Sequence, residues 1–548
     1  MRSFTNLVRA MFRRSGKVRR SPVRTKFRLL ALEARDVPSA YGDFNGDGYS
    51  DLAIGVPGED GGAGAVNVLY GTGSGLSAVG SQYWRQSGIN EFSEANDRFG
   101  TALAVGDFNG DGFDDLAIGV PGEDGRAGAV NVLRGSLQRL VPTFDPPIRQ
   151  GVGSFEDVAE PDDEFGFVLA AGDFNDDGYA DLAVGVPGED IGSITDAGAV
   201  HVVYGGDAGL MTGFDKLWSQ DNPGVPGHAQ VGDEFGSALA VGDFNGDGED
   251  DLAIGAPSED DEDGTNEVNV GAVVIIHGAH GPVYADGGLS TAIVPAQLWT
   301  QDSSGIEGTE EAQDLFGYAL AAGDFNGDFR DDLAIGVPGE DVNGIVDAGA
   351  VNVIYGSASG LTSANDQLWH QDSASVEDIA ASGDFFGSAL AAGNFNGDGA
   401  DDLAVGVMSD DLTNKIRTVQ NAGAVNVIYG WTGTVSSPNG GLSATITADQ
   451  HLHQDWAGVE DVAETSDLFG YALAVGDFNG DGKDDLAIGV IGEDVNGYED
   501  AGAVNVLYGS TTVGLTSNLD QFWHQGSPGI VGGLESYDGF GHGLGKRR

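Results

Sequence analysis

The sequence predicts an all-β protein, a seven-bladed β-propeller with four short strands in each blade. Three observations predict this fold. An acidic segment of the form Asp-Phe-Asn-Gly-Asp-Gly-x-x-Asp occurs seven times with small variations, at intervals of 64 to 83 residues. A Phe-Gly pair also occurs seven times, and short apolar runs bounded by Gly, Asp and Pro follow each acidic segment. Regular repetition of short strands and turns is typical of propellers.

Each repeat contains four predicted strands in the same order. The first, of the form FGxALAxGD, enters the acidic loop, and the second, DLAIGVP, leaves it. The third reads GAVNVLYG, and the fourth, of the form DQLWHQD, contains a Trp in five repeats. The residues at the Trp position are Trp84, Ile148, Trp218, Trp299, Trp369, Leu452 and Trp523. A β-solenoid is the alternative, but a repeat of about 70 residues is long for one solenoid coil.

The repeats occupy residues 41–548. Every acidic loop has its own Phe-Gly pair only if the two ends of the chain meet and close a ring. In six repeats the Phe of the Phe-Gly pair lies eight residues before the loop, whereas the first loop, at Asp43, has no such pair. The seventh pair, Phe540-Gly541, has no loop after it. We expect residues around Phe540–Leu544 to complete the first blade beside the strand near Asp51, so that N- and C-terminal strands close the ring. The alternative is that residues 37–42 supply this strand and the tail is a disordered remnant.

Residues 1–40 differ from the rest of the chain. They hold 11 Lys and Arg but only two acidic residues, and their longest apolar run, Leu29-Leu30-Ala31-Leu32, is too short to span a bilayer. The stretch LLALEARDVPSA resembles a short N-terminal signature of many predicted surface proteins of planctomycete bacteria. This resemblance implies an export segment that is disordered or removed, with processing near Ala40. A disordered basic tail that binds an anionic partner is the alternative.

Charge and composition narrow the possible functions. The chain has no Cys, which excludes disulfides and Cys-based zinc sites. Residues 41–548 carry 84 acidic and 14 basic residues, so nucleic acid and anionic membranes are poor partners. No transmembrane segment is expected. The carboxylates form either a solvated acidic coat or clusters that bind cations, and their positions favour the second explanation.

The acidic loops predict calcium sites. Side chains at positions 1, 3 and 5 of a curled loop converge on one point, Gly at position 6 permits the sharp turn, and position 7 offers its carbonyl. A carboxylate returns at position 9. This set of hard oxygen ligands suits Ca²⁺ better than Mg²⁺. Tight turns without a cation are the alternative, which seven equivalent matches make less plausible.

We therefore predict about seven Ca²⁺ sites. The predicted ligand positions are Asp43, Asn45, Asp47, Tyr49, Asp51; Asp107, Asn109, Asp111, Phe113, Asp115; Asp173, Asn175, Asp177, Tyr179, Asp181; Asp243, Asn245, Asp247, Glu249, Asp251; Asp324, Asn326, Asp328, Arg330, Asp332; Asn394, Asn396, Asp398, Ala400, Asp402; and Asp477, Asn479, Asp481, Lys483, Asp485. Two loops depart from the pattern and should bind more weakly. The fifth has Phe329 at position 6, and the sixth has Asn394 at position 1.

Other polar motifs have simpler interpretations. The pair Glu59-Asp60 could join a second cation site with acids such as Asp196 or Asp347, but capping of a hairpin is the favoured role. His451 and His453 lie on one face of a strand, where a surface role is favoured over metal binding. No G-x-S-x-G, H-E-x-x-H or G-x-x-x-x-G-K motif is present, and no residue is predicted to be catalytic.

The Phe-Gly and GVP segments, together with the seven acidic loops, resemble FG-GAP repeats, which form the seven-bladed propeller of integrin α subunits and of related bacterial surface proteins. The resemblance covers about residues 41–545. It implies a calcium-stabilised propeller used in extracellular adhesion or recognition. Integrin-type propellers carry cation loops in only some blades, whereas here every repeat has one, which favours a structural role for calcium. The membrane span and signalling of integrins do not transfer to this chain.

The combined expectation is a calcium-binding adhesion or recognition module, extracellular or at the cell surface, with an unknown protein or glycan ligand. Two alternatives stay open. One is an enzyme that uses a propeller scaffold to act on a polysaccharide or a phosphodiester. The other is a structural envelope protein cross-linked by calcium.

Overall fold

A computed structural model describes residues 41–89, 91–143, 146–152, 155, 157–213, 215–260, 268–281, 287–413, 417–432 and 440–544. The predicted export segment, residues 1–40, lies outside the described residues. Three single helical turns occur, α1 (Glu59–Gly62), α2 (Gln86–Ile89) and α3 (Glu123–Arg126). All other regular structure in the described part of the chain is β-strand.

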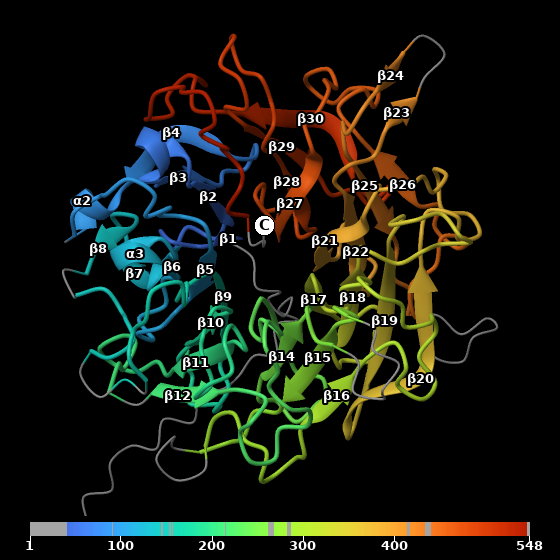
Figure 1. Ribbon diagram of the computed structural model, residues 1–548. Coiled ribbons are helices and arrows are strands. Elements are labelled where there is room, and N and C mark those ends of the chain that lie inside the picture. The colour runs from blue at the N-terminus through green and yellow to red at the C-terminus, as the bar shows by residue number, and fades with distance from the viewer. Residues whose placement is uncertain are drawn as a thin grey trace, which may run out of the picture. The chain divides into compact units, whose positions relative to one another are not determined.

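The strands form seven antiparallel four-stranded sheets, as predicted (Figure 1). In chain order the blades are β1 (Tyr41–Gly42), β2 (Asp51–Val56), β3 (Ala65–Tyr70), β4 (Ser77–Trp84); β5 (Leu103–Gly106), β6 (Asp115–Val120), β7 (Ala129–Arg134), β8 (Val141–Pro142); β9 (Val168–Gly172), β10 (Asp181–Val186), β11 (Ala199–Val203), β12 (Asp215–Trp218); β13 (Ala238–Gly242), β14 (Asp251–Ala256), β15 (Ala272–Ile276), β16 (Gln297–Trp299); β17 (Leu320–Gly323), β18 (Asp332–Val337), β19 (Ala350–Ser357), β20 (Gly360–Trp369); β21 (Phe386–Gly393), β22 (Asp402–Val407), β25 (Ala424–Ile428), β26 (Gln450–Leu452); and β27 (Phe469–Gly476), β28 (Asp485–Val490), β29 (Ala503–Tyr508), β30 (Thr516–Trp523). The sixth blade also carries a small hairpin, β23 (Leu412–Thr413) with β24 (Thr418–Val419).

The blades are arranged in a ring around a central axis. The first strand of each blade lies innermost and the fourth outermost (Figure 1). Each innermost strand contacts the innermost strand of the next blade, and β27 of the seventh blade contacts β1. The ring is therefore closed at the innermost layer.

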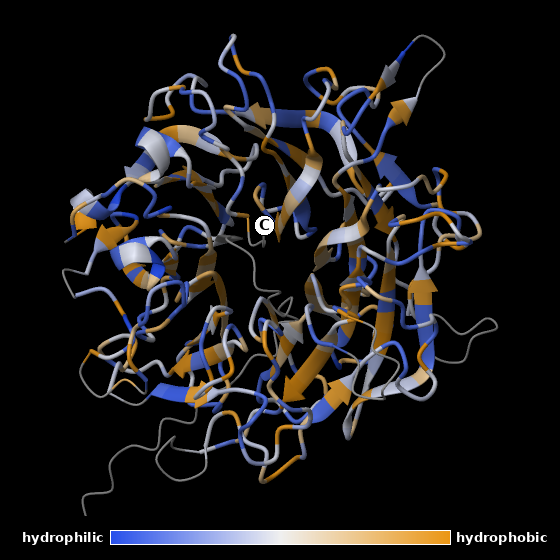
Figure 2. Cartoon of the chain, viewed as in Figure 1, coloured by the Kyte–Doolittle hydropathy of each residue, from blue (hydrophilic) through white to orange (hydrophobic). Residues whose placement is uncertain are grey.

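The hydrophobic core lies between the blades. The second strand of every blade, β2 for example, is buried along its whole length. One apolar cluster joins Val66 of the first blade to Leu116 and Ile118 of the second, and each larger cluster likewise combines neighbouring blades. Apolar residues concentrate on these inner strands (Figure 2). Burial on both faces explains why these strands read as continuous apolar runs.

The residues predicted to share the Trp position do occupy equivalent places. Trp84 is paired with Val66 of the third strand, and Trp523 is paired in the same way with Val504. The two substitutes keep this register, because Ile148 bridges Val130 and Leu452 pairs with Val425.

Both ends of the described chain complete the first blade. Tyr41 and Gly42 pair with the start of β2, at Leu52 and Asp51. Farther along the same strand, Gly543 forms an antiparallel bridge with Gly55. The two expectations for this strand are therefore each correct in part, since Tyr41–Gly42 and the tail both supply it, while residues 37–40 lie outside the described residues. The tail is no remnant, because Phe540 is fully buried and Leu544 nearly so.

The tail bonds to its neighbours as the Phe-Gly pair does elsewhere. The Phe540 N–H donates to the Ala501 carbonyl of the seventh blade at 3.0 Å, and the Gly541 N–H donates to Gly55 of the first blade at 3.2 Å. Phe99 and Gly100 make the equivalent bonds, to Ala63 and Gly119, at the boundary of the first and second blades. Gly541 has φ +96°, and a Cβ there would lie 2.7 Å from the Ala503 carbonyl oxygen, so only Gly fits.

Buried polar pairs also connect consecutive blades. A Gln that follows the fourth strand of one blade donates from Nε2 to a Glu after the second strand of the next blade. These Gln–Glu boundary pairs are Gln86–Glu123, Gln150–Glu189, Gln220–Glu259, Gln301–Glu340, Gln454–Glu493 and Gln525–Glu59. The last pair joins the seventh blade to the first. All twelve residues are buried, so each pair satisfies a carboxylate that is removed from water.

Burial raises the pKa of four of these glutamates, Glu123, Glu189, Glu340 and Glu493. Glu189 is 1% exposed, and its burial, reinforced by the neighbouring Asp157, raises its pKa to about 9. The folded protein therefore holds this proton more tightly than the unfolded chain does. The stabilising contribution is complete below the ordinary pKa near 4.5 and is lost as pH rises toward 9.

We expect Glu189→Gln to be close to neutral at pH 5 and to stabilise the protein by about 4 kcal/mol at pH 8, since the wild type loses about 1.4 kcal/mol for each of the roughly three pH units between them. The amide keeps an oxygen for Gln150 and carries no charge. Melting temperatures of both proteins between pH 5 and pH 9 measure the effect. Glu94→Gln, at an exposed position, serves as control. Equal pH profiles for Glu189→Gln and the wild type would show that Glu189 is not held protonated.

Candidate metal centres

The seven acidic loops lie side by side on one face of the ring, each joining the first and second strands of its blade. A backbone hydrogen bond links each loop to the next, from the N–H at position 8 to the carbonyl at position 1 of the preceding blade. The bonds are Asp114 to Asp43, Ala180 to Asp107, Asp250 to Asp173, Asp331 to Asp243, Asp401 to Asp324, Asp484 to Asn394 and Ser50 to Asp477. The series is unbroken around the ring, so the loops form one continuous acidic band.

The first loop shows how position 1 shapes the turn. The Asp43 carboxylate accepts hydrogen bonds from the backbone N–H groups of Gly46, Asp47 and Gly48, at 2.6, 3.0 and 2.8 Å. At position 5, Asp47 accepts the Tyr49 N–H at 3.2 Å. The carboxylates at positions 1 and 5 are thus held on the inside of the curled loop.

Position 9 supplies a buried carboxylate. Asp51 is fully buried and accepts the N–H groups of Phe44 and Gly71, at 3.0 and 2.9 Å. The Asn45 amide at position 3 lies 3.3 Å from the same carboxylate. All seven residues at position 9 are at most 1% exposed: Asp51, Asp115, Asp181, Asp251, Asp332, Asp402 and Asp485. Positions 1, 3, 5 and 9 thus line one loop, although none of the seven loops, all of which lie in the described residues, places three carboxylate oxygens, one each from positions 1, 5 and 9, within 4.8 Å of one another.

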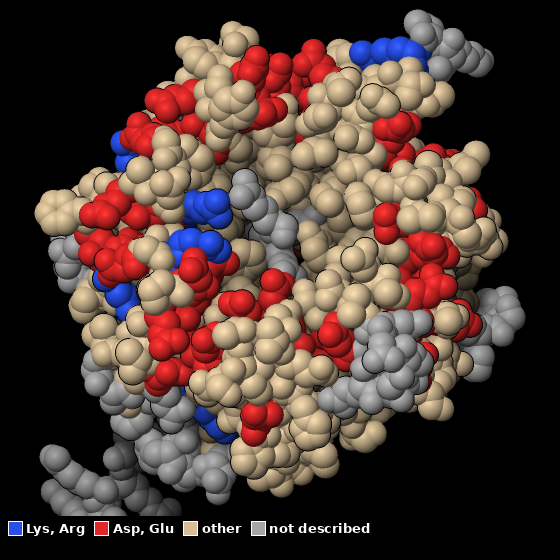
Figure 3. Space-filling view, in the orientation of Figure 1, with Lys and Arg blue, Asp and Glu red and all other residues tan. Residues whose placement is uncertain are grey.

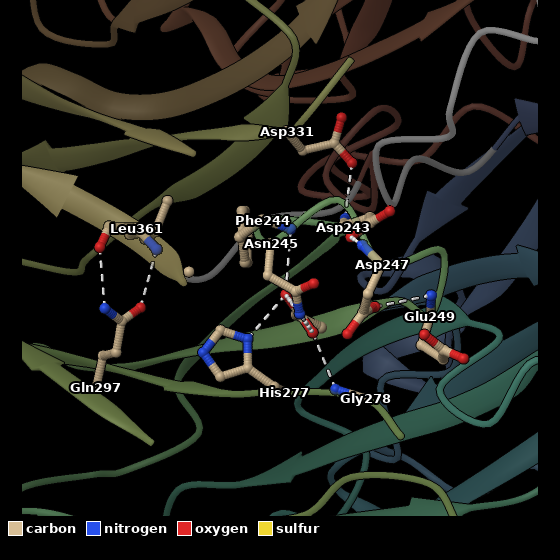
Figure 4. Close-up of polar contacts among 12 residues, drawn as sticks. Asp243, Phe244, Asn245, Asp247, Glu249, His277, Gly278, Gln297, Asp331 and Leu361 are labelled. Carbon is tan, nitrogen blue, oxygen red and sulfur yellow. Dashed lines mark hydrogen bonds and ion pairs between the residues drawn. The ribbon is translucent and has the colours of Figure 1, made fainter. Parts of the chain in front are cut away.

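The fourth loop carries an additional buried group (Figure 4). His277 Nδ1 lies 2.9 Å from the Asp251 carboxylate, and neither side chain is exposed. Asp331 of the next blade accepts the Asp243 N–H at 2.8 Å. The imidazole supports the carboxylate at position 9 from behind the loop.

Burial and mutual repulsion raise the pKa of the position-9 carboxylates. Burial raises the pKa of Asp51 to about 8, and the charges of Asp43 and Asp47 add to the shift. Burial likewise raises the pKa of Asp115 to about 7 and that of Asp485 to about 8. A divalent cation among these oxygens would remove the repulsion and favour the ionised form.

The donor atoms fit such a cation. Every predicted side-chain ligand at positions 1, 3, 5 and 9 is a carboxylate or an Asn, which suits Ca²⁺. The position-3 oxygens Asn175 Oδ1 and Asn326 Oδ1 are buried without a hydrogen-bond partner, and so is Asp402 Oδ2 at position 9. At position 7 only the backbone carbonyl was predicted to bind. The residue types at these positions therefore fit Ca²⁺.

The two irregular loops keep the fold of the others. Phe329 has φ +69°, as predicted for a position that is otherwise Gly, and its N–H donates to Asp324 Oδ2 at 2.7 Å. Its side chain is 72% exposed. In the sixth loop, Asn394 Oδ1 accepts the Asp398 N–H at 3.1 Å, but this position contributes no negative charge. Weaker calcium binding by both loops stays a prediction.

We expect Phe329→Gly to stabilise the protein slightly and to strengthen calcium binding at the fifth loop. The left-handed backbone costs a non-Gly residue about 1–2 kcal/mol, of which about 0.5–1 kcal/mol is offset because Gly gains more freedom in the unfolded chain. The reverse substitution in the fourth loop, Gly248→Phe at φ +99°, is the matched control and should destabilise. Calorimetric calcium titration measures both variants. Weaker binding by Phe329→Gly would show that this backbone interpretation is wrong.

A second set of carboxylates, which the predicted ligand positions did not include, lies at position 8. Asp114 Oδ2 accepts the Asp43 N–H of the preceding blade at 2.8 Å. Asp250, Asp331, Asp401 and Asp484 make the same bond to the preceding blade. Burial raises the pKa of Asp114 to about 6 and that of Asp250 to about 7. The signal was present in the sequence as an Asp-Asp pair that ends five of the seven loops.

The structure shows a capping role for two of the acids that follow the second strand. Asp190 and Asp341, which are equivalent to Asp60, accept the N–H groups of Asp196 and Asp347 at 3.0 Å. Glu59 instead contacts Gln525, Tyr83 and Arg85. Capping is therefore seen for Asp190 and Asp341, whereas Glu59 and Asp60 both form ion pairs with Arg85.

The acidic character extends over the surface. Figure 3 shows acidic side chains gathered over much of the visible face, with few basic side chains among them. None of the helices in the described part of the chain has the length and hydropathy needed to cross a membrane.

Comparison with known families agrees with this architecture. The FG-GAP repeat model matches residues 39–69, 99–133, 165–203, 235–276, 316–354, 386–428 and 469–507. Each match begins near the Phe-Gly pair or its equivalent and contains one acidic loop. The chain is an FG-GAP repeat β-propeller.

Its relatives include two kinds of larger protein. Integrin alpha pat-2 of Caenorhabditis briggsae is 32% identical over 286 residues, which is 48% of this chain and 21% of the integrin. Phosphatidylinositol-glycan-specific phospholipase D of Bos taurus is 36% identical over 181 residues, 32% of this chain and 19% of the phospholipase. This FG-GAP chain thus matches about a fifth of the length of either relative.

A solved structure, the exotype rhamnogalacturonan lyase YesX, aligns over 82% of this chain and 80% of its own, with 11% sequence identity and a TM-score of 0.33. A similarity this low carries no argument about the activity of the FG-GAP chain.

Proposed function

We propose that the seven loops bind Ca²⁺, about one ion each, and that calcium holds the propeller in its folded form. The observation that carries this proposal is the buried carboxylate at position 9 of every loop. Positions 1, 3, 5 and 9 would supply side-chain oxygens and position 7 its carbonyl. The ion would supply positive charge that offsets the burial and repulsion of three carboxylates per loop, or two in the sixth.

We also propose that this calcium-loaded propeller is an exported adhesion or recognition module, extracellular or at the cell surface. Its similarity to integrin α chains supports this role, as does the resemblance of residues 29–40 to an export signature. The ligand is a protein or a glycan. Activity on phosphodiesters is not proposed, because the similarity to the phospholipase covers 19% of that enzyme.

A binding screen with and without calcium tests the proposal. The protein is labelled and applied to glycan and protein arrays in calcium, in EGTA, and in EGTA followed by excess calcium. We expect ligand binding that disappears with EGTA and returns with calcium. A variant that removes one buried ligand, Asp485→Asn, should bind more weakly, whereas Asp302→Asn at an exposed position outside the loops should not.

Two results would contradict the adhesion role. One is ligand binding that is the same in calcium and EGTA. The other is calcium-dependent self-association at millimolar calcium without binding to any other ligand, which would favour a structural envelope protein.

A further inference from the structure

The boundary between the fifth and sixth blades differs from the other six. Asp410 lies after β22, where the other blades have the Glu of the boundary pair. Its shorter side chain does not take the equivalent Gln. Instead Gln371 Nε2 donates to Asp378, on the loop after β20, with an N···O distance of 3.1 Å. The carboxylate of Asp410 is thus available to a different partner.

His451 of β26 lies between these two carboxylates. Its Nε2 is 3.5 Å from Asp378 Oδ2 and 3.5 Å from Asp410 Oδ2. One ligand atom from each of the three residues lies within 4.8 Å of the other two. The same strand position is Leu217, Leu298 or Leu368 in other blades, so the histidine is not required by the fold.

Ordinary hydrogen bonding does not account for this geometry. A strong N–H···O bond is 2.7–3.2 Å long, and both contacts exceed that range. Asp410 is 5% exposed, and its Oδ2 has no hydrogen-bond partner although it points toward the imidazole. A buried carboxylate oxygen without a donor is costly unless a cation satisfies it, and either a protonated His451 or a metal ion bound by all three residues would supply that charge.

We propose that Asp378, Asp410 and His451 form a site for one divalent transition-metal ion, with Zn²⁺ as the expected occupant. Nitrogen and oxygen ligands that are each about 2.0–2.2 Å from a tetrahedral Zn²⁺ lie about 3.4 Å apart, which matches both measured distances. An imidazole nitrogen selects against Ca²⁺, which takes oxygen ligands. Gln371 serves as an outer partner that orients the Asp378 carboxylate.

A second group of this kind exists among the described residues, and it provides the competing assignment. Asp176, Glu249 and His280 also place three ligand atoms within 4.8 Å of one another. His280 is 70% exposed, and its Nδ1 lies 3.5 Å from Asp176 and 3.9 Å from Glu249. Water can hydrogen-bond to an exposed imidazole, so these three residues do not need a metal ion to satisfy their polar atoms.

Calorimetric titration with Zn²⁺ tests the proposal, using the full chain in excess calcium so that the acidic loops are saturated. We expect one Zn²⁺ per chain and a higher melting temperature with zinc. Loss of a residue that only orients a metal ligand lowers metal affinity about 10- to 100-fold. Removal of a ligand itself, in His451→Leu, should therefore raise the Kd for Zn²⁺ by more than about 100-fold. Leu occupies this position in three other blades, and the variant should therefore fold.

Two further measurements make the assignment specific. Asp410→Glu restores the residue found at the other boundaries, and it should lower zinc affinity while retaining the wild-type melting temperature without zinc. Co²⁺ in place of Zn²⁺ should give visible absorption typical of tetrahedral coordination, and His451→Leu should abolish it. His280→Asn is the control and should retain both signals.

Three outcomes would overturn the proposal. They are no zinc binding by the wild type in excess calcium, unchanged zinc affinity in His451→Leu, and loss of binding in His280→Asn but not in His451→Leu. The last result would assign the metal to the exposed group.

Discussion

Deletion of residues 536–548 is expected to lower the melting temperature strongly and to cause aggregation. These residues include Phe540 and Leu544, both buried against the first and seventh blades. They also include the N–H groups that bond to Ala501 and Gly55. Without them β2 has an unpaired edge along half its length, and such edges pair with other chains. Thermal melting and light scattering measure the two effects.

A point variant tests whether the tail closes the ring without leaving the edge of β2 unpaired. Phe540→Ala should destabilise by about 3–5 kcal/mol, as expected for a large buried aromatic residue. Phe92→Ala is the matched control, since Phe92 is 84% exposed and should change stability by less than about 0.5 kcal/mol. If the truncated protein melts at the wild-type temperature, the tail does not close the ring.

Removal of calcium is expected to have the second large effect. An ion that binds only the folded state stabilises it by about 2.7 kcal/mol at a free concentration 100 times Kd, and seven sites act together. In EGTA the buried carboxylates Asp51, Asp115 and Asp485 must either hold a proton or repel their neighbours. The melting temperature should therefore fall in EGTA and recover with calcium.

The calcium effect should also be local to the loops. Asp485→Asn should reduce the stabilisation by calcium, whereas Asp302→Asn should leave it unchanged. Differential scanning calorimetry over a calcium series measures both. A melting temperature that does not depend on calcium in the wild type would mean that the loops are ordinary turns.

Much of the fold could be predicted because the same order of apolar segments, acidic loop and turns occurs in each repeat. Seven copies made the strand order clear. The pairing of the fourth strand with the third keeps the same register even where Ile148 and Leu452 replace Trp. The Phe-Gly count indicated ring closure. It did not indicate that β1 and the tail would share one strand, because each is too short to show a strand period. The β23–β24 hairpin was missed for the same reason.

The candidate loops were also predictable, but their surroundings were not. Positions 1, 3, 5 and 9 follow from local spacing, and in the structure they line the same loop. The Gln–Glu boundary pairs join residues from different blades, 37 to 39 positions apart in the chain, and the pair Gln525–Glu59 is 466 positions apart. His451 stood out in the sequence only beside His453, with a surface role favoured, and Asp410 gave no signal, because their proximity depends on Asp378 from another segment.

The central claim is that every acidic loop is a calcium site, and calcium stoichiometry tests it most directly. The purified protein is equilibrated with calcium, freed of unbound ion, and analysed for calcium per chain by elemental mass spectrometry. We predict close to seven ions per chain, with the fifth and sixth loops, at Asp324 and Asn394, the first to empty as free calcium is lowered. Two or fewer ions at saturating calcium would contradict the account.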